Sequence, residues 1–182
     1  MTTLPAQIVS IHKALAKAQL PHAFGGALAL AWCTARARGT IDIDINVFVD
    51  TQRAADVFRA LPKKVRRSDA DLATLVRDGQ VRVWWDSTPL DLFLNTTSLH
   101  GEAALRTRWE HFAGESIPFL SCHDVAVFKA FFNRTKDWAD IEEMHAAGTL
   151  DVSQVTAVLI RYMGVDDERI AHLAAVGRLD RS

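Results

Sequence analysis

Three aspartates on strand-like runs are the residues of this 182-residue sequence best placed to do chemistry. Asp42 and Asp44 alternate with isoleucines in Ile41-Asp42-Ile43-Asp44-Ile45, so both carboxylates face one side of a strand. Asp91 lies in a second strand-like run, Leu90–Leu94, among leucines. Neighbouring carboxylates repel each other and are most readily held together by a divalent cation. The competing interpretation is a solvated strand face at Asp42 and Asp44, with Asp91 on an edge strand.

A glycine pair precedes the first acidic strand. Gly25 and Gly26 stand between a short strand over residues 22–24 and an Ala/Leu-rich helix expected over residues 27–35. Such a turn lets the backbone approach a ligand, and the amide groups at the helix start suit phosphate oxygens. Carboxylates holding two Mg²⁺ ions, with glycine amides and a nearby Arg or Lys, are the parts that phosphoryl transfer from a nucleotide requires.

Composition and periodicity indicate the kind of protein and the domains in which these residues lie. The chain is 49% hydrophobic and 24% charged, with a formal net charge of −1, so it carries no general attraction for nucleic acid or an anionic membrane. We expect one α+β domain over residues 1–120, with a mixed sheet flanked by helices. A C-terminal helical segment over residues 121–182 is expected to pack on it. The dense basic cluster from Lys63 to Arg67 is interpreted as a charged edge strand, in preference to a phosphate or RNA contact.

The remaining helices follow from caps and apolar spacing. Helices are expected over residues 4–20, 51–60, 151–163 and 166–176, and a short helix or a turn over residues 72–76. Ser121 with Asp124 predicts a capped helix that begins near His123 and runs on through Asn133 and Asp140. Cys33 and Cys122 show no metal-ligand spacing, and we interpret both as small buried hydrophobic residues in a reducing cytoplasm. No run is long and apolar enough to span a membrane.

In combination these segments resemble the nucleotidyltransferase superfamily that includes DNA polymerase beta. The resemblance covers roughly residues 20–145 and rests on Phe24-Gly25-Gly26, on Arg38-Gly39-Thr40 leading into Asp42-Ile43-Asp44, on Asp91 in Pro89-Leu90-Asp91-Leu92-Phe93, and on Lys129 with Arg134, Lys136, Asp137 and Asp140. The branches most similar are the small bacterial AbiEii toxin-like proteins and the lincosamide-type antibiotic nucleotidyltransferases.

The resemblance implies the nucleotidyltransferase fold and roles for particular residues. Asp42, Asp44 and Asp91 would be catalytic and would ligate Mg²⁺ or Mn²⁺, with Asp91 as metal ligand or general base. The nucleotide would be bound by Gly25, Gly26, Arg38, Thr40, Lys129, Arg134 and Lys136. Arg38 would contact phosphate or brace the aspartates. Helix capping and surface ion pairing remain an equal alternative for Lys129, Arg134 and Lys136.

The implied activity is transfer of a nucleoside monophosphate from an NTP to an acceptor hydroxyl by a cytoplasmic enzyme. The acceptor would be RNA or protein, in a toxin–antitoxin or phage-defence setting, with a homodimer or an antitoxin as partner. One alternative is an antibiotic-modifying enzyme with a small-molecule acceptor. The other is a catalytically silent nucleotide-binding or protein-interaction module that kept the fold.

Overall fold

The computed structural model describes residues 2–36 and 39–178. The chain divides into two compact units, each treated by itself below. The first comprises Met1–Leu28 and Gly39–Leu120, and the second Ala29–Arg38 and Ser121–Ser182. By this division the described residues 29–36 belong to the second unit.

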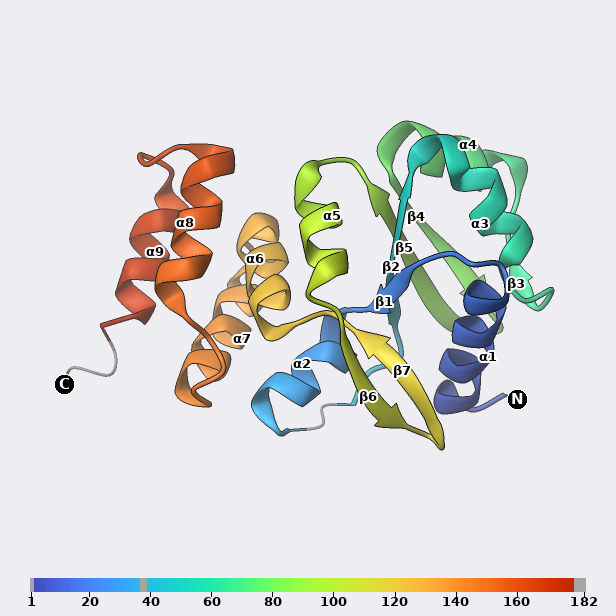
Figure 1. Ribbon diagram of the computed structural model, residues 1–182, viewed down its shortest axis with the longest axis horizontal. Coiled ribbons are helices and arrows are strands. Elements are labelled where there is room, and N and C mark those ends of the chain that lie inside the picture. Colours follow the sequence, from blue (N-terminus) through green and yellow to red (C-terminus); the bar gives the residue numbers. More distant parts are fainter. Residues whose placement is uncertain (1, 37–38, 179–182) are drawn as a thin grey trace. The chain divides into compact units, whose positions relative to one another are not determined.

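A mixed β-sheet organises the first unit (Figure 1). Among the described residues it has seven strands in the order β3-β4-β5-β2-β1-β7-β6. The pairs β2–β5 and β1–β7 are parallel, and the other neighbours are antiparallel. The strands are β1 His22–Phe24, β2 Ile43–Asp50, β3 Val65–Arg66, β4 Gln80–Trp85, β5 Thr88–Asn95, β6 Arg108–Phe112 and β7 Glu115–Phe119.

Alternation of apolar residues puts the core of this unit on one side of the central strands. Ile43, Ile45 and Val47 of β2 are fully buried, as are Leu90 and Leu92 of β5. The intervening positions of β2 and β5, including Asp44 and Asp91, belong to the opposite face because successive strand residues alternate. The expected α+β mixed sheet is thus confirmed, and the acidic residues lie outside its main core.

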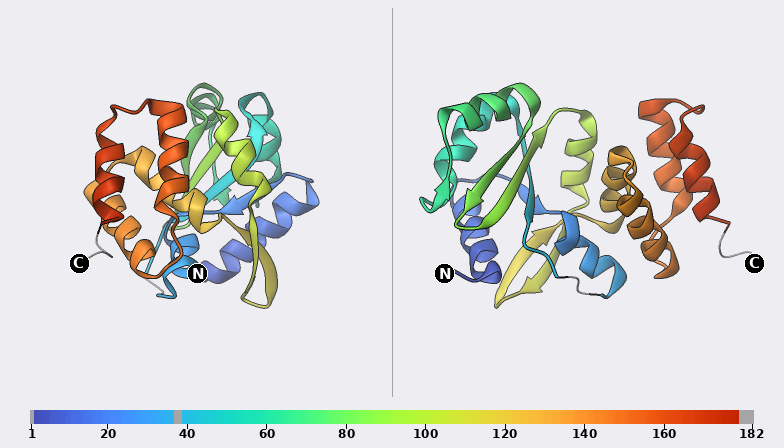
Figure 2. Two further views of the ribbon diagram at one scale, coloured as in Figure 1. Left: turned by 60° about the vertical axis from the view of Figure 1, so that its left-hand side comes forward. Right: turned by 180° about the vertical axis from the view of Figure 1, so that it is seen from behind.

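Helices cover this sheet on both sides (Figures 1 and 2). The amphipathic helix α1 buries Ile8, Ile11 and Leu15, and it lies with α3 and α4 on one side of the sheet, whereas α5 lies on the other. Ser68 and Asp71 form a capping box at the start of α4. The helices are α1 Leu4–Lys17, α3 Ala54–Ala60, α4 Asp69–Asp78 and α5 Ser98–Leu105, with a 3₁₀ turn at Thr51–Arg53 and with α2, Gly26–Thr34, shared between the units.

The second unit is helical. Its helices are α6 Cys122–Phe132, α7 Thr135–Ala146, α8 Val152–Met163 and α9 Glu168–Val176. The single helix predicted through residue 140 is wrong, because Asn133 ends α6 in a left-handed conformation with φ of 55°. The Asn133 side-chain oxygen accepts a hydrogen bond of 2.8 Å from Trp138 Nε1, which fixes this break.

A disulfide inside the second unit corrects the interpretation of the cysteines. Cys33 at the end of α2 is bonded to Cys122 at the start of α6, with their Cα atoms 5.5 Å apart. Both side chains are buried as predicted, but neither thiol is free. Spacing along the sequence could not reveal this pair, because the two cysteines are 89 positions apart.

No helix within residues 2–36 and 39–178 is long and apolar enough to cross a lipid bilayer.

Candidate active site

Strand register brings acidic side chains together on the first unit, and we call Asp42, Asp44 and Asp91 the acidic row. Asp44 of β2 is the register partner of Asp91 on the parallel strand β5, and Asp91 is in turn the partner of Arg82 on the antiparallel strand β4. Register partners point to the same face of a sheet. Asp44, Asp91 and Arg82 therefore lie side by side across three neighbouring strands, on the face opposite Ile43 and Ile45.

Asp42 joins this row from just before β2. Its Oδ2 lies 3.8 Å from Arg82 Nη2, and the same nitrogen lies 2.7 Å from Asp91 Oδ2. Thr40 fixes the backbone of Asp42, because its hydroxyl accepts a 3.2 Å hydrogen bond from Asp42 N and donates a 3.3 Å hydrogen bond to Asp42 O. The structure thus places Thr40 as a support of Asp42, whereas the resemblance implied a contact with nucleotide.

The glycine pair lies against Asp44. Gly25 N donates a 2.9 Å hydrogen bond to Asp44 O, so this amide is engaged within the protein. Gly26 begins α2 with φ of +54°, and a Cβ atom added there would lie only 1.9 Å from Asp44 Oδ2. The first amides of a helix have no partner inside the helix and attract anions. The start of α2 therefore adjoins the acidic row, next to Asp44.

Arg82 is the counter-charge of the row, and sequence reasoning did not identify it. Its Nε and Nη2 donate to the two carboxylate oxygens of Asp91, both at 2.7 Å. These hydrogen bonds are the largest cause of its raised pKa, and the nearby charges of Asp91, Asp42 and Asp44 act in the same direction. Two carboxylates on adjacent strands repel each other. A bidentate guanidinium offsets that repulsion.

The donor chemistry of the row suits a hard divalent cation. Asp42, Asp44 and Asp91 offer carboxylate oxygens, the ligand type that Mg²⁺ takes in proteins. In the described part of the chain, however, no three His, Cys, Asp or Glu residues are already gathered in a metal-binding cluster. Arg82 instead holds both oxygens of Asp91. Arg82 lies closer to Asp91 than to Asp42, with nitrogen–oxygen distances of 2.7 and 3.8 Å.

The predicted phosphate contacts on the C-terminal helices form an ion-pair cluster within the second unit. Lys129 Nζ lies 2.6 Å from Asp140 Oδ2 and 3.5 Å from Asp137 Oδ1, and Arg134 Nε lies 2.6 Å from Asp137 Oδ2. Burial opposes ionisation of Asp137, but hydrogen bonds from Arg134 and the charge of Lys129 outweigh it and lower its pKa. Lys136 is exposed. The ion-pairing alternative describes Lys129 and Arg134, and a role in binding nucleotide stays a prediction. Arg38 lies outside the described residues.

Comparison with known proteins identifies the fold. No protein-family model matches the chain, and no curated protein sequence matches it. Among solved structures, ANT(2'')-Ia in complex with adenylyl-2''-tobramycin matches with a TM-score of 0.61 and 16% identity, over 96% of this chain and 99% of that one. The lincomycin-bound lincosamide antibiotic adenylyltransferase LnuA matches with a TM-score of 0.53 and 14% identity, over 78% of this chain and 96% of that one.

These likenesses define the architecture of the chain. A solution structure of the antibiotic-resistance factor ANT(2'')-Ia matches as well, with a TM-score of 0.56 and 17% identity over 99% of this chain. The chain has the nucleotidyltransferase fold, and the resemblance inferred from its motifs is confirmed at the level of the fold.

Proposed function

We propose that this protein transfers a nucleoside monophosphate from an NTP to an acceptor hydroxyl. The observation that carries the proposal is the convergence of Asp42, Asp44 and Asp91 on one sheet face, beside a helix that begins at Gly26. On this fold, three carboxylates in a row serve no packing purpose and create repulsion. They are the groups that metal-assisted phosphoryl transfer uses.

Asp42 and Asp44 would hold Mg²⁺ or Mn²⁺, which when bound supplies charge neutralisation for the phosphates and activation of the acceptor hydroxyl. Asp91 would complete the ligand set or take the acceptor proton. Arg82 orients Asp91 through its two hydrogen bonds. The start of α2 would accept a phosphate group through its first backbone amides. Lys129 and Arg134 would assist only if their pairing with Asp137 and Asp140 rearranges.

The acceptor divides the proposal into two versions. RNA or protein, in a cytoplasmic toxin–antitoxin or defence system with a partner antitoxin or a second copy, is the first. The second is a small-molecule antibiotic. A small-molecule acceptor is compatible with the match to ANT(2'')-Ia in complex with adenylyl-2''-tobramycin, which extends over 99% of that chain. The two versions share the NTP chemistry and differ only in the molecule that becomes labelled.

Label transfer from α-³²P NTPs tests both versions in one experiment. The protein is incubated with Mg²⁺ and each NTP, together with cell extract in one series and with aminoglycosides or lincosamides in another. We expect label in RNA or protein in the first series, or in the antibiotic in the second, and no label with Asp42→Ala/Asp44→Ala. Absence of transfer in both series, with no thermal stabilisation by Mg²⁺-ATP, would favour the catalytically silent alternative.

A further inference from the structure

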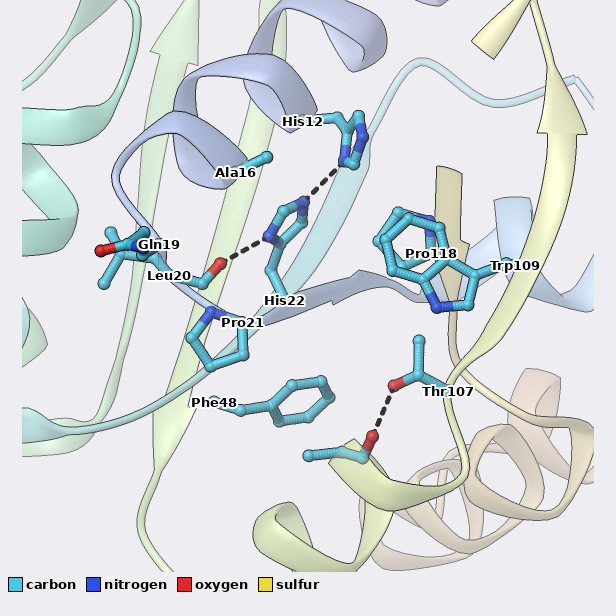
Figure 3. A pocket seen from close by; sticks show the side chains of 11 residues that line it. His12, Ala16, Gln19, Leu20, Pro21, His22, Phe48, Thr107, Trp109 and Pro118 are labelled. Carbon is cyan, nitrogen blue, oxygen red and sulfur yellow. Dashed lines mark hydrogen bonds between the residues drawn. The ribbon is translucent and has the colours of Figure 1, made fainter. Parts of the chain in front are cut away.

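A cavity of about 360 Å³ lies within the first unit, where β1 and β7 separate. These two strands share one register pair, Phe24 with Phe119, so the ladder does not continue toward His22. Pro118 has no N–H with which to extend it. The space that results is lined by side chains from α1, β1, β2, β6 and β7 (Figure 3).

A chain of hydrogen bonds fixes the polarity of one wall. His22 Nδ1 lies 2.8 Å from Leu20 O, and because a carbonyl only accepts, this nitrogen carries the hydrogen. Burial lowers the pKa of His22 to about 4, so its ring is neutral and its Nε2 accepts. His12 Nδ1, 2.9 Å away, must therefore donate to it (Figure 3).

His12 consequently presents an acceptor. Burial also lowers the pKa of His12, the largest effect on it, against an opposing effect of the Glu115 charge. A neutral ring that donates through Nδ1 has a bare lone pair on Nε2. Within the described residues no group is hydrogen-bonded to that nitrogen. Thr107 adds a second acceptor, since its hydroxyl hydrogen is donated to Ala104 O at 3.0 Å.

The remaining walls are mostly apolar, apart from the amide side chain of Gln19. Trp109 and Pro118 lie together on one side, with Pro21 and Phe48 beneath the histidines (Figure 3). The Trp109 side chain is 62% exposed and meets the His12 ring edge-on at 6.0 Å. An exposed tryptophan ring offers a flat apolar face with an N–H at its edge. Among the described residues that line the cavity, none carries a carboxylate, ammonium or guanidinium group.

We propose that this cavity binds an uncharged planar ring that stacks against Trp109 and donates an N–H or O–H hydrogen bond to His12 Nε2. The acceptors on His12 and Thr107 favour a ring that carries a donor, and the absence of a carboxylate among the described lining residues disfavours a polycation such as an aminoglycoside. The volume is in the range of small-molecule sites. Phe48 lies four residues beyond Asp44 on β2, about 13 Å along the strand, so the cavity is separate from the acidic row. The proposal does not depend on the proposed function.

Indole and 1-methylindole test the proposal, because they differ in the one N–H donor. Isothermal titration at pH 7.5 is expected to give an indole affinity about three- to tenfold higher than that of 1-methylindole, the range of one neutral hydrogen bond. His12→Phe should abolish this difference. Trp109→Ala should weaken indole at least fivefold, whereas Trp84→Ala, a half-exposed tryptophan on β4, should leave it unchanged.

Asp44→Asn should also leave indole binding unchanged, because the two sites are separate. Equal affinity of the two probes, no binding of either, or equal effects of Trp109→Ala and Trp84→Ala would overturn the proposal. So would loss of indole binding in Asp44→Asn. Because the Trp109 side chain is mostly exposed, Trp109→Ala should remain folded. This variant therefore still tests the proposal if His12→Phe fails to fold.

Discussion

Gly26→Ala adds a methyl carbon in the space that the Asp44 carboxylate occupies. The new Cβ would lie 1.9 Å from Asp44 Oδ2 and 2.6 Å from its Cγ. Since non-bonded carbon atoms settle at about 3.5 Å or more, the carboxylate must move by more than about 1 Å. A displacement of 1 Å at a reacting group costs about 100-fold in rate. We therefore expect Gly26→Ala to lower kcat/KM for nucleotidyl transfer at least 100-fold.

Gly114→Ala is the matched control for backbone strain. Gly114, in the turn between β6 and β7, has φ of +85°, and no atom lies within 4 Å of an added Cβ. Alanine in a left-handed conformation costs about 1–2 kcal/mol at either site. In a chain of this length that corresponds to a Tm lower by about 2–8 °C. Label transfer and thermal unfolding are measured on both variants.

Gly114→Ala should show the loss in Tm with wild-type transfer, whereas Gly26→Ala should lose transfer as well. Transfer by Gly26→Ala within threefold of wild type would refute the placement of Asp44 in the reaction. An equal loss of transfer in Gly114→Ala would refute the reasoning in a different way, because strain alone would then account for the effect.

Three further predictions concern charge, covalent linkage and pH. Arg82→Gln should lower transfer at least tenfold while changing the free energy of unfolding by less than about 1 kcal/mol, because the Arg82 side chain is half exposed. An unchanged rate of transfer would contradict the orienting role of Arg82. The double variant Cys33→Ser/Cys122→Ser should have a free energy of unfolding lower by up to about 4.6 kcal/mol in urea without reductant, because the disulfide closes a loop of about 90 residues. If reductant has no effect on the stability of the wild type, the disulfide is contradicted. Burial lowers the pKa of His22 to about 4 in the folded chain, so folding stabilises its neutral form. The contribution of His22 to the free energy of unfolding is therefore fully present above pH 6.5, and up to about 3 kcal/mol of it is lost as the pH falls toward 4. His22→Gln should flatten this decline in pH-dependent thermal unfolding, and an equally steep decline in the variant would refute it.

The central strands were predictable because their sequence pattern reflects local physics. Ile43 and Ile45 alternate with Asp44, and the burial of the isoleucines follows directly. The basic edge strand was also predicted: β3, Val65–Arg66, is the outer strand of the sheet next to β4. Its neighbour Arg67 donates to three backbone carbonyls of this segment, so part of that charge is structural.

What the sequence did not reveal depends on contacts between distant residues. Arg82 becomes the partner of Asp91 only through the register of β4 on β5, which no spacing rule supplies. The Cys33–Cys122 bond requires the ends of α2 and α6 to meet. The first helix ends at Lys17 and not at the expected residue 20, and a 3₁₀ turn at Thr51–Arg53 precedes α3 where a helix was expected from residue 51. Such ends depend on local hydrogen bonds more than on composition.

Binding of a metal–nucleotide complex tests the central claim most directly, because it needs no acceptor. A non-hydrolysable ATP analogue with a methylene group between the α- and β-phosphates is titrated into the protein by calorimetry, with and without Mg²⁺. We predict Mg²⁺-dependent binding that weakens at least 100-fold in Asp42→Asn/Asp44→Asn, while Asp78→Asn, an exposed aspartate at the end of α4, binds as wild type does. Binding by the double variant equal to that of the wild type, or binding independent of Mg²⁺, would contradict the assignment of the acidic row as the nucleotide site.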